Sequence, residues 1–172
     1  MKKTTLTIAC MLISILAFTQ EFKKPAEGKS LVYFVRTKGA GSLINFKFFD
    51  GKKFLGKMSG ANYFTYECDP GNHLFWVASE NKDFIQGELI EGGTYIIQSK
   101  PQAGAFTTRV ALEQVFPNND KLLKKIRKVL SKKSEYNLKG KNEDFSLFIG
   151  DGMKRFENIK HKVKKIDPKQ HF

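Results

Sequence analysis

Short apolar runs separated by turn residues occupy the chain from residue 30 to residue 116. The run at 43–49 shows the period clearly, because Ile44, Phe46 and Phe48 fall on one face of an extended chain. Runs of this kind predict seven to eight strands, within residues 31–37, 43–49, 54–58, 63–68, 74–79, 84–90, 94–99 and 106–115. Short strands at this spacing, with no helix among them, favour a mainly β chain folded as an antiparallel β-sandwich.

Glycine-containing turns separate several of these runs. The Asp50-Gly51 pair supplies the positive φ that a tight hairpin requires. The Pro70-Gly71 pair predicts a second turn, because proline pre-sets φ at the second turn position and glycine suits the third. Two glycines at 92–93 predict a further hairpin.

After Pro117 the period changes from two to that of a helix. The first apolar stripe consists of Leu122, Leu123, Ile126, Val129 and Leu130. The second consists of Phe145, Phe148, Ile149, Phe156, Ile159, Val163 and Ile166. Gly150 and Gly152 should either kink the second helix or delay its start to about Met153. The sequence therefore predicts two C-terminal amphipathic helices, with a loop at 136–142 between them.

The N-terminus has the pattern of a secretory signal peptide. Lys2 and Lys3 precede an uncharged apolar run of 13 residues, from Leu6 to Phe18. A transmembrane helix needs about 20 apolar residues, whereas a signal peptide needs roughly 7–15. We expect cleavage before Gln20 and no transmembrane span in the mature chain, which would then be periplasmic, secreted or peripheral on the envelope.

Two alternatives to this interpretation were weighed. The apolar run could be a buried N-terminal helix, and Cys10 could be a lipid-attachment cysteine. Cys10, however, lies inside the apolar run rather than after it, and Thr7 stands three residues before it where leucine would be expected. Cleavage of a signal peptide is therefore favoured over lipid attachment.

The net charge of +13 is concentrated in the C-terminal third. Residues 20–116 hold 12 Lys and Arg against 10 Asp and Glu, whereas residues 117–172 hold 16 against 7. We therefore divide the chain into a signal peptide at 1–19, a β-sandwich domain at 20–116, and a basic helical C-terminal extension at 117–172 packed on that domain. With 16 Phe and 5 Tyr, the chain has enough apolar surface for a real core.

Cys68 and His73 form the sharpest candidate for chemistry. In a two-residue hairpin around Pro70-Gly71 they would lie directly opposite each other and could form a thiolate–imidazole pair. A bulged turn would break this register, and no third polar group is evidently placed to orient the histidine. The favoured alternative is a buried thiol beside a histidine that braces the turn.

No other pattern points to catalysis or to a metal. The chain has no phosphate-binding glycine loop, no GxSxG elbow and no HExxH helix. Its three histidines lack the spaced partners of a zinc site. Carboxylates near the turns cannot be paired as acid and base from sequence. We therefore expect no metal, no cofactor and no enzyme.

The basic character of the first C-terminal helix is the strongest candidate for function. Its cationic positions outside the apolar stripe are Lys124, Lys125, Arg127, Lys128, Lys132 and Lys133. Such a helix can lie on anionic lipid with its stripe among the headgroups, or bind acidic glycan or the negative face of a partner. The favoured alternative is that the stripe packs on the sandwich and the lysines stay in water. Nucleic acid is a poor partner for an exported protein, although a pI near 9.7 would permit it.

Residues 31–116 resemble a family of small secreted or lipid-anchored bacterial domains of unassigned function. The resemblance rests on an early strand ending in arginine, an Asp-Gly hairpin followed by a glycine, an aromatic before the next strand, a Pro-Gly-Asn-His turn and a Gly-Gly strand entry; these are residues 32–36, Asp50, Gly51, Gly56, Tyr63, 70–73 and 92–97. It implies a transthyretin- or immunoglobulin-like sandwich without catalytic activity, and it says little about the basic tail.

These patterns together predict an exported, non-enzymatic binding or structural module of the cell envelope, whose partner is an unknown envelope protein. The alternative is an envelope-associated protein that binds anionic lipid or glycan through its basic C-terminal helices. A cysteine- and histidine-dependent enzyme is the third and least favoured reading.

Overall fold

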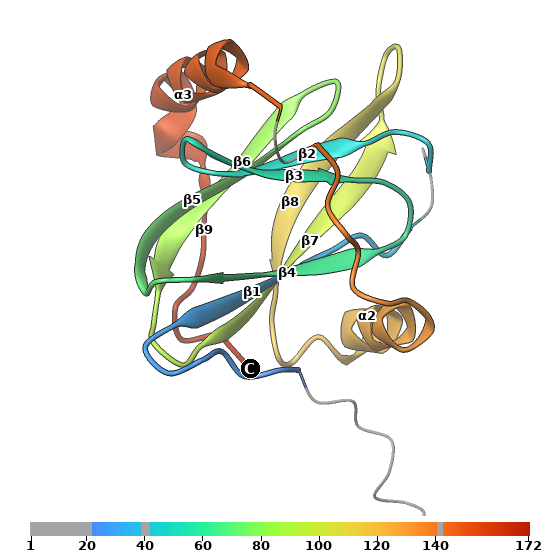
Figure 1. Ribbon diagram of the computed structural model, residues 1–172, viewed down its shortest axis with the longest axis vertical. Coiled ribbons are helices and arrows are strands. Elements are labelled where there is room, and N and C mark those ends of the chain that lie inside the picture. The colour runs from blue at the N-terminus through green and yellow to red at the C-terminus, as the bar shows by residue number, and fades with distance from the viewer. Residues whose placement is uncertain (1–21, 39–41, 141–142) are drawn as a thin grey trace, which may run out of the picture.

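The computed structural model describes residues 22–38, 42–140 and 143–172, and within these ranges the chain is mainly β (Figure 1). The strands are β1 (Ser30–Val35), β2 (Phe46–Asp50), β3 (Lys53–Met58), β4 (Tyr63–Cys68), β5 (Gly71–Ala78), β6 (Lys82–Leu89), β7 (Thr94–Ala103), β8 (Thr108–Val115) and β9 (Lys164–Lys165). Two helices follow β8, namely α2 (Asp120–Lys132) and α3 (Ser146–Ile159), and a short 3₁₀ helix, η1 (Lys160–Lys162), continues α3. The prediction of a mainly β chain with two C-terminal helices is confirmed.

The strands form two sheets. One has four strands in the order β4-β1-β7-β8, and the other has five in the order β3-β2-β5-β6-β9. Most neighbours are antiparallel, but β1 runs parallel to β7 and β9 runs parallel to β6. The sheets are therefore mostly, but not wholly, antiparallel. The sequence did not predict the two parallel pairs, because an apolar period identifies the buried face of a strand and not its neighbour or direction.

The two sheets share one buried cluster of side chains. Phe34 of β1 stacks on Phe64 of β4, with ring centroids 4.9 Å apart. The same ring meets Phe75 of β5, in the other sheet, at 5.3 Å. Val32 and Phe48 belong to this cluster as well. Phenylalanines from both sheets therefore make up much of this shared cluster.

The helices cover the opposite faces of the two sheets. Along β1, Leu31, Tyr33 and Val35 point away from the shared cluster, because successive side chains alternate across a strand. They pack instead with the apolar stripe of α2, which consists of Leu123, Ile126 and Leu130. β1 is buried on both faces for this reason, and its burial shows no alternation.

α3 covers the outer face of the five-stranded sheet in the same way. Phe49 and Trp76 stack with centroids 3.7 Å apart, and Phe148 of α3 lies over both rings. Figure 1 shows α2 and α3 far apart in the view, joined by a connection that runs past β4 and β3. Residues 136–140 of that connection are not helical, as predicted, and residues 141–142 lie outside the described ranges.

Gly152 explains how α3 approaches the sheet. A Cβ atom at this position would lie 2.7 Å from Cη2 of Trp76, so only glycine fits between the helix and the indole. Gly150 and Gly152 both lie inside α3, which begins at Ser146. The predicted delay of the helix to about Met153 is therefore wrong: Gly152 serves close packing against Trp76, and Gly150 is an open position within the same helix.

The end of the chain returns to the sheets. Val163 and Ile166, which the apolar period placed on the second helix, lie beyond it. Ile166 belongs to the cluster between the sheets, and its side chain passes so close to Gly87 of β6 that a Cβ there would lie 2.7 Å away. The backbone N–H of Phe172 donates to the carbonyl of Thr94 over 2.8 Å. The C-terminal residues thus complete the core and one sheet edge.

The turn around Pro70-Gly71 differs from its prediction. β4 and β5 belong to different sheets, so this turn passes from one sheet to the other. Cys68 pairs with Ser30 of β1, and His73 pairs with Gly87 of β6. The predicted cross-strand pairing of Cys68 with His73 is therefore wrong, because β4 pairs with β1, whereas β5 lies between β2 and β6.

Candidate functional site

Four lysines of α2 line one shallow surface pocket. Lys125, Lys128 and Lys132 lie at i, i+3 and i+7, which places them along one side of the helix next to its buried stripe. Lys133 caps the same helix. We define these four residues, all exposed, as the lysine face. Among the described residues, none of the four lies within ion-pair distance of a carboxylate.

The pocket beside the lysine face has a volume of about 310 Å³. Thr37, Ala61 and Val129 complete its lining. Apolar groups and a hydroxyl therefore lie among four ammonium groups that have no carboxylate partner in the described part of the chain. An arrangement of this kind attracts an anionic ligand that also carries an apolar face.

The other two predicted cations of α2 lie elsewhere. Lys124 is exposed but does not line the pocket. Arg127 is half-buried, with its guanidinium carbon 5.8 Å from the centroid of the Phe22 ring. Its Nε atom is buried and donates to no partner among the described residues. Arg127 therefore packs the N-terminal segment onto the helix and is not part of the lysine face.

The apolar stripe of α2 is occupied by the protein itself. Leu123 and Ile126 are at most 2% exposed, and Leu130 is 6% exposed. The stripe therefore cannot enter a lipid bilayer while the helix stays on its sheet. Insertion of the stripe among lipid headgroups is thus incompatible with the fold, whereas lysines that stay in water, or that contact an anionic ligand through the charged side, are compatible with it.

Cys68 and His73 interact despite lying on different strands, and Asp50 bonds to His73. The Nδ1 atom of His73 lies 2.8 Å from Oδ2 of Asp50, and its Nε2 atom lies 2.9 Å from the carbonyl oxygen of Asp69. The Tyr66 hydroxyl donates to the same Asp50 oxygen over 3.2 Å. Asp50 is thus the third polar group that orients the histidine. The sequence did not reveal this role, because an Asp-Gly pair predicts only a turn.

The electrostatics favour a charged imidazole at this point. The hydrogen bond to Asp50, followed by the interaction with Cys68, raises the pKa of His73 to about 10. An imidazolium donates at both nitrogens, here to the Asp50 carboxylate and to the Asp69 carbonyl. A ring with both nitrogens protonated cannot accept the proton of a thiol.

The thiol itself is enclosed. Cys68 is 8% exposed, and its Sγ donates to the carbonyl of Ser30 over 3.9 Å. Burial also raises the pKa of the neighbouring Tyr66, and the adjacent Asp50 raises it further. The cluster therefore ties the β4–β5 turn to the end of β2, across the two sheets.

Metal ligands and membrane spans were sought over the same residues. In the described ranges, no three His, Cys, Asp or Glu side chains are grouped to hold a metal ion. No helix in these ranges has the length and apolar character needed to cross a membrane. The predicted signal peptide and Cys10 lie in residues 1–21, outside the described ranges.

The chain was compared with protein-family models, with curated proteins and with solved structures. No family model, curated protein or solved structure matches it.

Proposed function

We propose that this chain is an exported, non-catalytic binding module of the cell envelope whose lysine face holds an acidic polysaccharide. The observation that carries the proposal is the pocket of about 310 Å³ in which four lysines surround Ala61 and Val129. Carboxylate or sulfate groups along a glycan would meet the ammonium groups, and the C–H face of a sugar ring would lie on the apolar lining.

The spacing of the lysines supports a polymeric ligand. Lys125 and Lys132 are seven residues apart, which in a helix corresponds to about 10 Å. Lys38 lines a neighbouring pocket that also includes Lys125, so the cationic surface continues beyond the helix to Lys38, whereas Lys100 of the same lining is paired with Glu113 at 2.8 Å. A chain carrying a charge on each sugar ring could contact several of these cations at once.

Burial of the α2 stripe is the reason for preferring glycan to lipid at this face. A peripheral membrane helix owes much of its affinity to apolar area buried among lipid headgroups. That area is already covered by the four-stranded sheet, where Ile126 is fully buried. The lysine face can therefore offer only charge and a small apolar pocket.

The buried cluster of Asp50, Cys68 and His73 supports a carrier without catalysis. Both imidazole nitrogens are occupied by Asp50 and by the Asp69 carbonyl, and the thiol faces a backbone carbonyl. We interpret the cluster as a brace between sheets that share a core. As part of the same proposal, residues 31–116 form a β-sandwich like that of the secreted bacterial family they resemble, and this sandwich carries the lysine face.

The test is binding of the chain without residues 1–19 to dextran sulfate and to polygalacturonate, with neutral dextran as the blank. The triple variant Lys125→Gln, Lys128→Gln, Lys132→Gln removes three charges from exposed positions. Each exposed ionic contact contributes about 0.5 kcal/mol, so the loss of three contacts should weaken binding roughly tenfold.

A matched variant separates local charge from total charge. Lys162, Lys165 and Lys169 are exposed near the C-terminus and outside the lysine face, so their replacement by Gln removes the same net charge. This control should lose less than about twofold in affinity. Equal losses in the two variants, or no binding of either polyanion, would contradict the proposal.

A further inference from the structure

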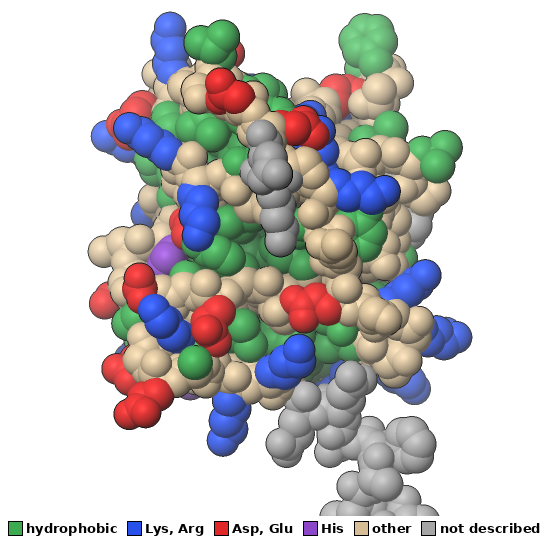
Figure 2. Space-filling model, viewed as in Figure 1, with side chains coloured by type: hydrophobic (Ala, Val, Ile, Leu, Met, Phe, Trp, Pro, Cys, Tyr) green, Lys and Arg blue, Asp and Glu red, His purple; other side chains and the backbone are tan. Residues whose placement is uncertain are grey.

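Two large apolar side chains stand almost fully exposed on different elements. Phe106, at the tip of the β7–β8 hairpin, is 94% exposed, and Leu147, in the first turn of α3, is 90% exposed. Figure 2 shows hydrophobic side chains projecting from the upper end of the molecule, over α3 and over the tip of this hairpin. Single apolar residues are common on protein surfaces, but these two are held on ordered elements.

The hairpin tip is held in place by Glu80, in the turn between β5 and β6. Its carboxylate accepts the backbone N–H groups of Ala105, Phe106 and Thr107 at 2.9, 3.1 and 2.7 Å. These bonds, that to Thr107 first, lower the pKa of Glu80. The carboxylate also leaves no room for a side chain at Gly104. Phe106 is thus presented on an ordered loop, although nothing in the described chain covers it.

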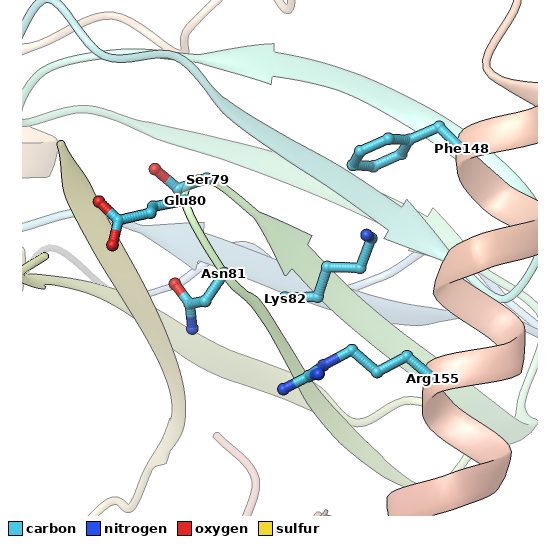
Figure 3. Close-up of a pocket in the computed structure, with 6 residues that line it drawn as sticks. All are labelled: Ser79, Glu80, Asn81, Lys82, Phe148 and Arg155. Carbon is cyan, nitrogen blue, oxygen red and sulfur yellow. The ribbon is translucent and has the colours of Figure 1, made fainter. Parts of the chain in front are cut away.

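A cationic pocket lies between the hairpin and α3 (Figure 3). Its volume is about 330 Å³, and it is lined by Ser79, Glu80, Asn81, Lys82, Phe148 and Arg155. Phe148 and Arg155 extend from α3 towards the strand that carries Lys82, while Glu80 lies on the hairpin side. The Nζ atom of Lys82 lies 4.5 Å from the centroid of the Phe148 ring.

The charge of this pocket is not balanced from within. Among the described residues, neither Lys82 nor Arg155 makes an ion pair. The one carboxylate in the lining, that of Glu80, is already engaged by three backbone N–H groups of the hairpin. The lining therefore keeps an excess of one positive charge, two cations against one carboxylate, and both cations are open to an anion from outside.

We propose that this end of the molecule, defined by Phe106, Leu147, Lys82 and Arg155, docks on a bilayer that contains anionic phospholipid. Phe106 and Leu147 enter the interfacial region, where the burial of apolar area drives binding. Lys82 and Arg155 meet the phosphate groups of the lipid, to which an arginine fork can donate two hydrogen bonds.

The layout favours a bilayer over a protein partner. Protein interfaces place their apolar anchors together at the centre of a patch, with polar groups around the rim. Here the two cations line a pocket between α3, whose first turn carries Leu147, and the β5–β6 turn, whose Glu80 holds the hairpin tip that carries Phe106. A layer of phosphates above acyl chains matches this arrangement. The site is separate from the lysine face, since α2 and α3 cover different sheets.

The test is co-sedimentation of the chain without residues 1–19 with phosphatidylcholine vesicles, with and without phosphatidylglycerol. The unchanged protein should pellet with the anionic vesicles and much less with the neutral ones. The double variant Phe106→Ser, Leu147→Ser should bind at least about tenfold more weakly, since each side chain loses apolar burial. The double variant Lys82→Gln, Arg155→Gln should lose roughly tenfold, and only towards anionic vesicles.

Two controls make the outcome specific. Leu43 is 91% exposed on the connection between β1 and β2 and does not line the pocket, so Leu43→Ser should bind like the unchanged protein. Gln at positions 125, 128 and 132 should also leave vesicle binding within about twofold, which separates this site from the lysine face. No binding to anionic vesicles, or losses as large in the controls as in the site variants, would overturn the proposal.

Discussion

His73 illustrates how one residue joins the two sheets. Its ring donates to Asp50 at the end of β2 and to the Asp69 carbonyl at the turn after β4, and it stacks on Phe75 with centroids 5.3 Å apart. The side chains of His73 and Asp50 are only 12% and 13% exposed. A charged pair in this setting stabilises the fold only while both partners stay ionised.

The pH dependence of stability follows from the raised pKa of His73. The folded pKa is about 10 and the ordinary value is 6.5, so the contribution is complete below pH 6.5 and is lost as the pH rises through 10. His73→Gln should therefore lower the free energy of unfolding by about 2 kcal/mol at pH 6. The difference from the unchanged protein should shrink towards zero above pH 10. Urea unfolding across this range measures it, and a difference that does not change with pH would contradict the brace.

At the scale of elements, α3 depends on close contact with the five-stranded sheet. Trp76 lies beneath the helix, stacked on Phe49 and close to Phe148, and its Nε1 donates to the carbonyl of Gly51 over 2.8 Å. The indole is thus fixed from below and cannot move aside when the helix surface changes. Gly152 is the helix position nearest to it.

Gly152→Ala tests this contact. Alanine is the better helix former, so helix propensity alone would make the substitution stabilising by about 1 kcal/mol. The added Cβ would lie 2.7 Å from the indole, however, and overpacking of this kind costs about 1–3 kcal/mol. We expect a lower melting temperature. Gly150→Ala is the matched control, because a Cβ there meets nothing within 4 Å, and it should be neutral or stabilising.

The strands and both helices could be predicted, because apolar periods report which face of an element is buried. The partners of β1 could not, since a strand buried on both faces carries no alternation, as its burial shows. Asp50 and Gly152 were assigned to a turn and to a helix start, because their actual roles depend on contacts distant in sequence.

Of the candidate site, the sequence supplied the lysines of α2 but not their setting. Lys125, Lys128, Lys132 and Lys133 were among the predicted cations, whereas Thr37 and Ala61 come from other parts of the chain. Lys82 and Arg155, which line the pocket beside α3, are isolated charges in the sequence. Lys82 begins β6 and Arg155 lies in α3, so no local sequence pattern connects the two.

At the scale of the molecule, the C-terminal third is part of the folded core. α2 buries Leu123 and Ile126 on one sheet, and Ile166 fills the cluster between the two sheets. The side chain of Gln114 donates to the carbonyls of Asp167 and Gln170, which ties the last residues to β8. Removal of residues 117–172 should therefore expose the core rather than release a stable domain.

Ile166→Ala measures this dependence without truncation. The side chain is 3% exposed, and loss of a buried isoleucine side chain costs about 2–5 kcal/mol. We expect a fall of this size in the free energy of unfolding, measured by denaturant. The matched control is Leu147→Ala, a substitution at a fully open position, which should change stability by less than about 0.5 kcal/mol. An equally small effect of Ile166→Ala would mean that the C-terminal residues are a detachable extension.

The central claim is that the lysine face binds an acidic polymer through several lysines at once. The most direct measurement is the dependence of the dextran sulfate affinity on salt concentration, for the unchanged protein and for the triple variant with Gln at positions 125, 128 and 132. Each lysine that displaces a counterion contributes about one to the slope of log affinity against log salt. A slope reduced by about two to three in the variant is the result predicted here. An unchanged slope would show that the polymer binds elsewhere on the molecule.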